Sequence, residues 1–265
     1  IAPLPAAKLT AFVAVSSVKS AVKLLGLAHK HLSAGLTGFE MMGKFALSLV
    51  NKHFPQQRVP FLDIADANYC VVLEHSDHES EAHAKAQLEK FLEAAMGNEE
   101  GGGCILDAVL AENLTQAKQL WHIRECIPLA QAQEGLNIKH DISIPISSIP
   151  EFVRVTDEKL AVAYPGIRLV NYGHLGDGNL HYNVQAPEGA DQAAFLNNDE
   201  AGVNAIVFSM VDQFAGSISA EHGVGSLKVD KLPEHKSPIA IELMRTIKRA
   251  LDPHNIMNPG RVVRV

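Results

Sequence analysis

The sequence lacks several features that would assign it directly to a familiar class of protein. It has three cysteines, Cys70, Cys104 and Cys126, and no Cys-x-x-Cys spacing, so we expect neither a disulfide framework nor a cysteine-based zinc knuckle. A run of about 18 apolar residues, the length that a transmembrane helix needs, does not occur. The formal net charge is −7 and long basic runs are missing, which argues against nucleic acid as a partner.

Nucleotide-binding and serine-hydrolase motifs are also missing. Residues 176–181 and 223–228 match the dinucleotide fingerprint Gly-x-Gly-x-x-Gly only in part, and neither opens a helix directly after a strand. A Gly-x-Ser-x-Gly nucleophile elbow does not occur. The sequence does contain 13 histidines in a chain whose composition is 47% hydrophobic, so a large core is expected and the placement of the histidines is informative.

Short apolar runs alternate with helical patterns along the chain. Two strands joined by a tight turn at 167–185 must be antiparallel, which excludes a purely parallel sheet and favours an α+β fold with a mixed or antiparallel sheet. Pro128 is expected to close a helix or to lie in its last turn. The predicted strands are 9–15, 35–42, 68–76, 104–111, 136–145, 166–174, 179–186 and 216–223. The predicted helices are 16–31, 44–53, 78–96, 114–127, 148–163, 199–214 and 238–251.

The hairpin NYGHLGDGNLHYNV, residues 171–184, carries a histidine on each strand. Asp177 and Gly178 are a preferred central pair of a two-residue type I′ turn. That turn places His174 opposite His181, with Cβ atoms about 4.5–5.5 Å apart. The alternation of strand side chains then puts four residues on one face: Tyr172, His174, His181 and Asn183.

Two adjacent imidazoles can bind one metal ion, but a catalytic zinc usually has three protein ligands. The best third ligand is Glu221, which precedes the glycine-rich run 223–225. Its neighbour His222 can then act as a base close to whatever the metal binds. The alternative, that a histidine is a hydrogen-bonded structural residue, remains open for the paired histidines and is preferred for the isolated ones: His29, His53, His75, His83 and His235.

Three blocks of the sequence together resemble one protein family. They are GHLGDGNLHYNV (173–184), GSISAEHGVGSLK (216–228) and IKRALDPHNIMNPGRV (247–262). Their order and spacing are similar to those of the C-terminal domain of the FAD-linked oxidases that act on D-2-hydroxy acids. That group includes D-lactate dehydrogenase of the cytochrome type, the glycolate oxidase flavin subunit and D-2-hydroxyglutarate dehydrogenase. The segment 124–152 also resembles the middle part of this family.

The resemblance implies a domain organisation and a set of functional residues. Residues 1–265 would be a ferredoxin-like α+β substrate domain with a largely antiparallel sheet covered by helices. FAD would be bound by an N-terminal domain that this sequence does not contain. The implied roles are a divalent metal, zinc above all, at His174, His181 and Glu221; the base at His222; substrate contacts at Arg124, Lys139 and Asn183; and a position near the flavin at Asn258.

The implied reaction is the oxidation of a D-2-hydroxy acid to the 2-oxo acid, with hydride transfer to FAD. Family members specific for dicarboxylates have a Thr four residues after the Arg, where this chain has Pro128, so the expected substrate is D-lactate-like. Two alternatives stay open: a free-standing metal-dependent hydrolase or lyase, and a non-catalytic subunit. We expect a cytoplasmic protein, or one that associates with a membrane through an unidentified electron acceptor. A homodimer is also allowed.

Overall fold

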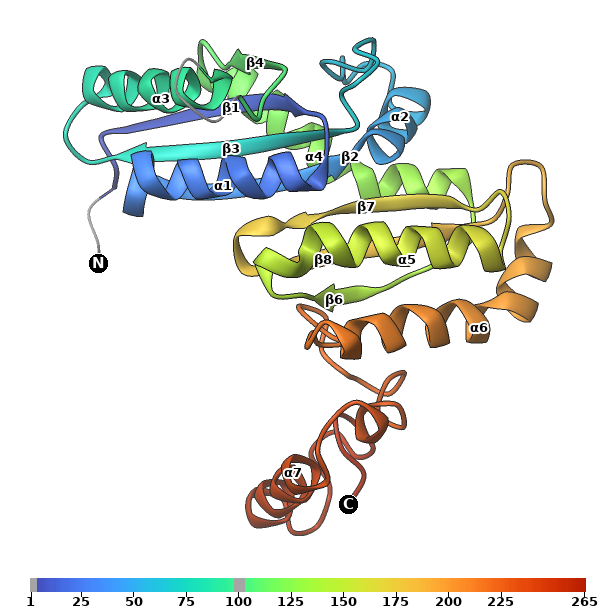
Figure 1. Ribbon diagram of the computed structural model, residues 1–265. Coiled ribbons are helices and arrows are strands. Elements are labelled where there is room, and N and C mark those ends of the chain that lie inside the picture. Colours follow the sequence, from blue (N-terminus) through green and yellow to red (C-terminus); the bar gives the residue numbers. More distant parts are fainter. Residues whose placement is uncertain (1–3, 98–102) are drawn as a thin grey trace.

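One open sheet of eight strands forms the centre of the computed structural model, which describes residues 4–97 and 103–265 (Figure 1). The strand order is β4-β1-β3-β2-β7-β8-β5, and β6 also pairs with β8. Each of these pairings is antiparallel, which confirms the expected α+β class. The strands are β1 (Ala7–Val15), β2 (Leu36–Gly43), β3 (Tyr69–Asp77), β4 (Asp107–Leu110), β5 (Asn137–Ile138), β6 (Asp141–Ser143), β7 (Arg168–His174) and β8 (Asn179–Gln185).

Helices cover both faces of this sheet. One face packs against α1 (Val18–Leu32), α3 (Glu81–Met96), α5 (Ile149–Ala163) and α6 (Gln192–Gln213), and the other packs against α2 (Lys44–His53) and α4 (Leu114–Glu134). The strands are therefore apolar on both sides: Val71 and Leu73 of β3 face the first group, whereas Cys70 and Val72 face the second. The described short 3-10 helices are Ser33–Gly35, Ile146–Ser148, Leu175–Asp177 and Leu232–Glu234.

The sheet consists of two ferredoxin-like units that meet edge to edge. In the first unit, β1-α1-β2-β3-α3-β4 has the strand order β4-β1-β3-β2, and α2 is inserted between β2 and β3. In the second unit, β6-α5-β7-β8-α6 is followed by Ser217, which makes an isolated bridge to Ser143 of β6. The order Ser217-β6-β8-β7 repeats that of the first unit. The pairing of β2 with β7 joins the two units into one sheet.

Four predicted elements differ clearly from the structure. The helix expected at 199–214 begins seven residues earlier, at Gln192. The strand expected at 136–145 is broken at Lys139 and His140 into β5 and β6, and the strand expected at 216–223 is reduced to the bridge at Ser217. The helix expected to end near Pro128 continues to Glu134, so Pro128 lies inside α4. Proline removes one helical hydrogen bond. We attribute the continuity of α4 to burial of the flanking side chains of Ile127, Ala130 and Gln131 against the sheet.

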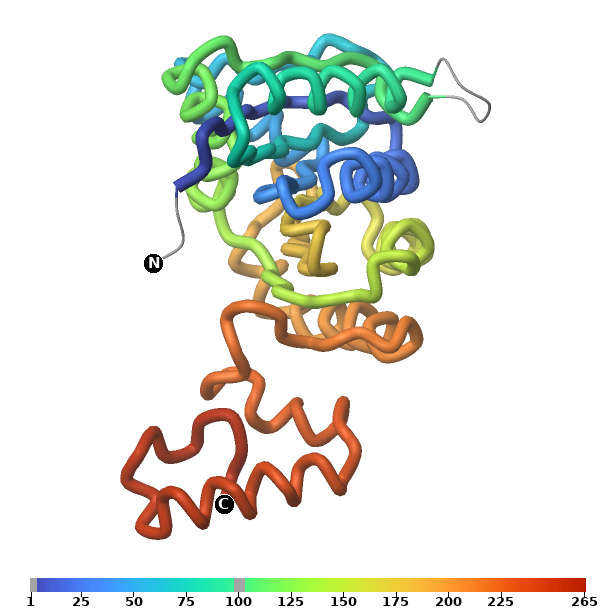
Figure 2. The backbone as a smooth tube through the Cα atoms, turned by 90° about the vertical axis from the view of Figure 1, so that its left-hand side faces the viewer, coloured from blue at the N-terminus to red at the C-terminus, as the bar shows by residue number. Residues whose placement is uncertain are grey.

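The C-terminal segment projects away from the two units (Figures 1 and 2). It contains α7 (Pro238–Leu251) and a small core of Leu232, Ile241 and Val263. None of the described helices is long and apolar enough to cross a membrane. One side of α7 leaves large apolar side chains exposed: Ile239, Leu243, Ile247 and Leu251.

Candidate functional site

The hairpin that carries the two histidines has a different register from the one predicted. His181 lies opposite Tyr172, not opposite His174. The connection is a 3-10 turn over Leu175–Asp177 that ends at Gly178 in the left-handed conformation, not a two-residue type I′ turn. His174 lies opposite Glu40 of β2, on the other edge of β7 from the hairpin partner β8.

The register error leaves the predicted face intact. The observed pairing differs from the predicted one by two residues, and only a shift by an odd number moves a strand's side chains to the other face. Tyr172 belongs to the core on the α4 side, whereas Leu180 and Tyr182 belong to the core on the opposite side. His181 therefore shares the face of Tyr172, on the side of the sheet that α4 covers.

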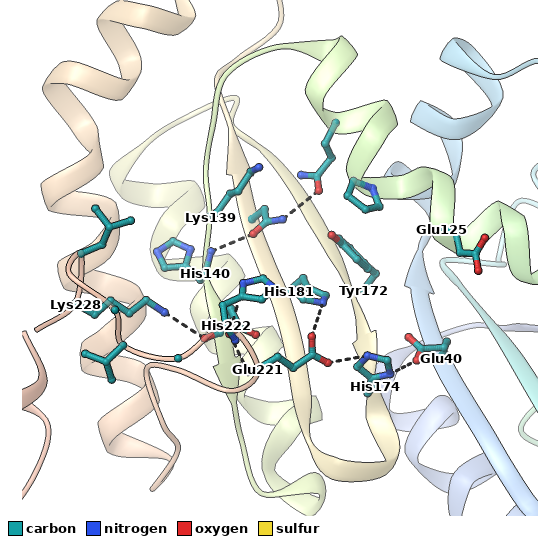
Figure 3. Close-up of a pocket in the computed structure, with 18 of the residues that line it drawn as sticks. Glu40, Glu125, Lys139, His140, Tyr172, His174, His181, Glu221, His222 and Lys228 are labelled. Carbon is teal, nitrogen blue, oxygen red and sulfur yellow. Dashed lines mark hydrogen bonds and ion pairs between the residues drawn. The ribbon is translucent and has the colours of Figure 1, made fainter. Parts of the chain in front are cut away.

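The two histidines and Glu221 converge, as the sequence predicts. The Glu221 carboxylate lies between them, with Oε1 2.7 Å from His174 Nε2 and Oε2 3.9 Å from His181 Nε2 (Figure 3). The other ring nitrogen of His174, Nδ1, contacts the carboxylate of Glu40. Glu40 is buried in β2, so His174 is held between a buried carboxylate and a half-exposed one.

A second buried carboxylate, that of Asp141 in β6, anchors the segment that carries Glu221. Asp141 Oδ2 accepts backbone N–H groups from Ala220 at 3.3 Å, Glu221 at 2.9 Å and His222 at 2.8 Å. Burial raises the pKa of Asp141, but the hydrogen bonds from His222 and Glu221 outweigh it and lower the pKa overall, which keeps the carboxylate ionised. Lys228 adds a bond from Nζ to the Ile218 carbonyl at 2.6 Å. These bonds fix a segment that has almost no regular sheet pairing.

His181 and His222 have different surroundings. Burial, with the nearby charge of Arg124, lowers the pKa of His181 to about 4, so its imidazole is neutral at neutral pH. The ring of His222 stacks on it, with centroids 5.7 Å apart and 26° between the planes. The His222 side chain is 68% exposed, and its Nδ1 lies 3.7 Å from Asp141 Oδ2. His222 therefore stands at the open side of the cluster.

A cavity of about 820 Å³ adjoins this cluster and contains the predicted substrate contacts. Arg124 of α4 donates from Nε to Glu40 Oε2 at 2.9 Å, and its guanidinium lies 5.3 Å from the ring centroid of Tyr172. Lys139, at the break between β5 and β6, and Asn183 of β8 also line the cavity.

Asn183 is held by the protein itself. Its Oδ1 accepts the backbone N–H of His140 at 3.0 Å, so its amide nitrogen is the group that donates to Gln131 Oε1 at 3.1 Å. Gln131 is 1% exposed and forms part of the cavity wall.

The predicted flavin contact, Asn258, is exposed and is not among the described residues that line this cavity. Arg261, three residues further along the same segment, does line it. Sequence reasoning missed Arg261 as well as Glu40, Gln131 and Asp141. The one local signal was charge within apolar strand patterns, at Glu40 in the run 35–42 and at Asp141 in the run 136–145.

The donor set fits a divalent cation. Two imidazole nitrogens and one carboxylate are a common ligand set for catalytic zinc, and His181 is already neutral, as a metal ligand must be. Glu40 on Nδ1 of His174 leaves Nε2 as the ligating nitrogen, in the usual arrangement of a carboxylate behind a metal-bound histidine. Among the described residues, the group whose ligand atoms all lie within 4.8 Å of one another is Asp141, His181 and His222, which shares only His181 with the predicted set.

Known proteins resemble the chain in sequence. The family described as FAD linked oxidases, C-terminal domain, matches residues 4–262. A D-2-hydroxyglutarate dehydrogenase of Xanthomonas citri pv. viticola is 39% identical over 86% of this chain and 46% of its own length. A protein of Schizosaccharomyces pombe with the provisional name of a mitochondrial D-lactate dehydrogenase is 31% identical over 98% of this chain and 48% of its own length. The chain thus spans about half the length of these relatives.

The fold also has a counterpart among solved structures. The crystal structure of p-cresol methylhydroxylase with substrate bound superposes with a TM-score of 0.69 over 99% of this chain and 54% of that chain. At 11% identity this likeness concerns the fold alone. The family match over nearly the whole sequence, together with relatives above 30% identity along most of it, assigns the protein: it belongs to the family of FAD linked oxidases, C-terminal domain.

Proposed function

We propose that this chain forms the substrate-binding part of an FAD-dependent dehydrogenase that oxidises a D-2-hydroxy acid to the 2-oxo acid. The observation that carries the proposal is the cluster of His174, His181 and Glu221 at the wall of a cavity that Arg124 and Lys139 also line. Cationic side chains suit a small carboxylate ligand. The relatives' names, which refer to D-2-hydroxyglutarate and D-lactate, support the same substrate class.

In this proposal, one set of residues binds the substrate and another residue accepts the proton of its hydroxyl group. Arg124 and Lys139 hold the substrate carboxylate, and Arg124 is already oriented by Glu40 and by the ring of Tyr172. One amide N–H of Asn183 donates to Gln131, so the other N–H is the group that binds the substrate. His222 takes the proton of the substrate hydroxyl as general base, a role for which imidazole is the side chain most often used.

We further propose that His174, His181 and Glu221 hold a divalent cation, with zinc as the first candidate. A cation at this position would supply Lewis acidity toward the hydroxyl oxygen of the substrate. Asp141 Oδ2 already accepts three backbone N–H groups, so only its Oδ1, which has no hydrogen-bond partner among the described residues, is free to face a cation. We assign Asp141 to positioning Glu221 and His222.

FAD, which the family name includes, supplies the hydride acceptor. We propose that a part of the protein outside residues 1–265 binds most of it. The glycine-rich runs 176–181 and 223–228 do not lead into a helix, as a pyrophosphate-binding loop would. Asn258 is proposed to approach the flavin from the terminal segment, where its neighbour Arg261 reaches the cavity.

The choice between D-lactate and D-2-hydroxyglutarate depends on the residues that face the side chain of the substrate. Pro128 lines the cavity and offers no hydroxyl, which supports a D-lactate-like substrate. A cavity of about 820 Å³ also has room for a longer chain, so D-2-hydroxyglutarate belongs in the same test.

The test uses the complete flavoprotein under anaerobic conditions. Bleaching of the flavin absorbance after mixing with D-lactate or D-2-hydroxyglutarate, but not with the L enantiomers, is the expected result. His222→Ala should slow bleaching about 10²–10⁴-fold without loss of bound metal, whereas His29→Ala, an exposed change on α1, should leave the rate unchanged. Bleaching by neither acid would refute the proposal. Loss of metal in proportion to rate would make His222 a ligand.

Compartment and assembly are proposals of the same kind. The sequence favours a cytoplasmic protein, although the Schizosaccharomyces pombe relative is named as mitochondrial. The exposed apolar side of α7 could support a homodimer of the isolated chain. We expect such a dimer to disappear in the complete flavoprotein, and sedimentation of both forms would check this.

A further inference from the structure

Glu40 contacts both halves of the candidate site. It lies in β2, in the first ferredoxin-like unit, and its side chain is 5% exposed. One carboxylate oxygen, Oε2, accepts a hydrogen bond from Arg124 Nε at 2.9 Å. The other oxygen, Oε1, contacts His174 Nδ1, whose second ring nitrogen lies 2.7 Å from Glu221 (Figure 3). The two oxygens thus serve two different partners, one on the substrate side and one on the cation side.

The backbone fixes this arrangement. Glu40 and His174 are directly opposed partners in the antiparallel pairing of β2 and β7, so their side chains leave the same face of the sheet at close range. Arg124 comes from α4, which packs on that face. A buried carboxylate between two nitrogen donors satisfies its hydrogen-bonding capacity within the protein, which makes its position well defined.

We propose that Glu40 is the positioning residue that joins cation binding and substrate-carboxylate binding into one unit. This inference rests on the proposed function. The Glu40 carboxylate accepts the Nδ1 proton of His174, which selects the tautomer with a free Nε2 lone pair toward Glu221. The same carboxylate holds the guanidinium of Arg124 in the cavity wall.

The substitution Glu40→Gln weakens both contacts at once. The side-chain amide lacks the negative charge that faces Arg124 and His174, its single oxygen accepts from only one of them, and its NH₂ group faces the other. A purely structural role would reduce the folded fraction and leave the binding constants of the folded protein unchanged. A positioning role changes two constants that are measured with two different probes.

The first probe is Zn²⁺, whose dissociation constant is measured by competition with a fluorescent chelator. The second is 2-oxoglutarate, measured by calorimetry on the complete flavoprotein saturated with Zn²⁺. We expect Glu40→Gln to raise the Zn²⁺ constant about 10–100-fold, the usual cost of losing an outer partner of a metal-bound histidine. We expect the dissociation constant of 2-oxoglutarate to rise at least tenfold. In turnover of D-2-hydroxyglutarate, KM should change more than kcat.

The matched control is Glu74→Gln in β3, which removes a partly buried carboxylate paired with Lys8 at 3.0 Å. Neither constant should change there. Glu40→Asp, which keeps the charge on a shorter side chain, should recover one constant more than the other, and it also serves if Glu40→Gln does not fold.

The possible results separate this inference from the proposed function. Both constants unchanged in Glu40→Gln would overturn the inference. A change in only one constant would also overturn it, because Glu40 would then serve a single partner. If the unsubstituted flavoprotein binds neither Zn²⁺ nor 2-oxoglutarate, and neither D-lactate nor D-2-hydroxyglutarate bleaches its flavin, the proposed function fails, and the role of Glu40 fails with it.

Discussion

Replacing Glu134 by Gln should destabilise the protein strongly at pH values at which the Glu134 carboxyl is ionised, and less at lower pH. Glu134 is the last residue of α4, and its side chain is 7% exposed. Its Oε2 lies 2.6 Å from Lys52 Nζ and 2.8 Å from His53 Nε2, and its Oε1 lies 2.6 Å from Arg168 Nη1. These contacts join α2 and α4 to β7, beside the pairing that unites the two ferredoxin-like units.

The magnitude follows from the pKa of the Glu134 carboxyl. Burial alone would raise this pKa, but the hydrogen bonds from Lys52, His53 and Arg168 outweigh it and lower the pKa from an ordinary 4.5 to about 2. A difference of that size corresponds to about 3 kcal/mol of folding free energy at neutral pH. Because the folded-state pKa is the lower one, this contribution is complete above pH 4.5 and disappears as the pH falls toward 2.

Urea unfolding of the unsubstituted protein and of Glu134→Gln, at pH 7, 5 and 3, measures the contribution. We expect a deficit of about 3 kcal/mol at pH 7 and 5, and a smaller one at pH 3. The control is Glu125→Gln on the same helix, where the carboxylate is 67% exposed beside His122 and the expected loss is below about 0.5 kcal/mol. A deficit that stays the same from pH 7 to pH 3 would refute the electrostatic reasoning.

Three further predictions concern the site and its support. Asp141→Asn removes the charge that anchors the backbone of 220–222; urea unfolding should show a loss of about 2 kcal/mol, and equal protease sensitivity of this segment in both proteins would contradict the anchoring role. Gly173→Ala places a Cβ 2.5 Å from the Asn179 carbonyl oxygen at φ 153°, so the melting temperature should fall by an amount equivalent to about 1–3 kcal/mol, and an unchanged melting temperature would contradict this. Gln131→Met leaves the buried amide of Asn183 without its acceptor, at a cost of about 1–3 kcal/mol in the same assay; a neutral result would mean that another acceptor replaces it.

The two predicted histidines lie on the same face of the sheet because side-chain alternation tolerates one kind of register error. The turn at Asp177 and Gly178 was assigned the wrong length, and the hairpin register was wrong by two residues. A two-residue shift moves each side chain along the strand but keeps it on its face. His174 and His181 therefore still meet Glu221, although they are not directly opposed to each other.

The missed parts of the site depend on contacts that are distant in sequence. Glu40 precedes Arg124 by 84 residues, and nothing local to either residue indicates that β2 pairs with β7. Asp141 supports 220–222 by side-chain hydrogen bonds where a strand was predicted, so the periodicity of that segment was misleading. The continuation of α4 through Pro128 likewise depends on burial against the sheet, which outweighs the local preference of proline.

The two ferredoxin-like units explain why the site lies where it does. The first unit supplies Glu40 on its edge strand β2, and the second supplies His174 on its edge strand β7 and His181 on the next strand, β8. Arg124 comes from α4, the helix that leads from the first unit to the second. Two edge strands that pair with each other satisfy their free backbone groups. The pairing also places buried polar side chains from distant segments next to one another. A site built across such a pairing is complete only when both units are folded and joined, so the interactions that stabilise the junction, those of Glu134 among them, also hold the candidate site together.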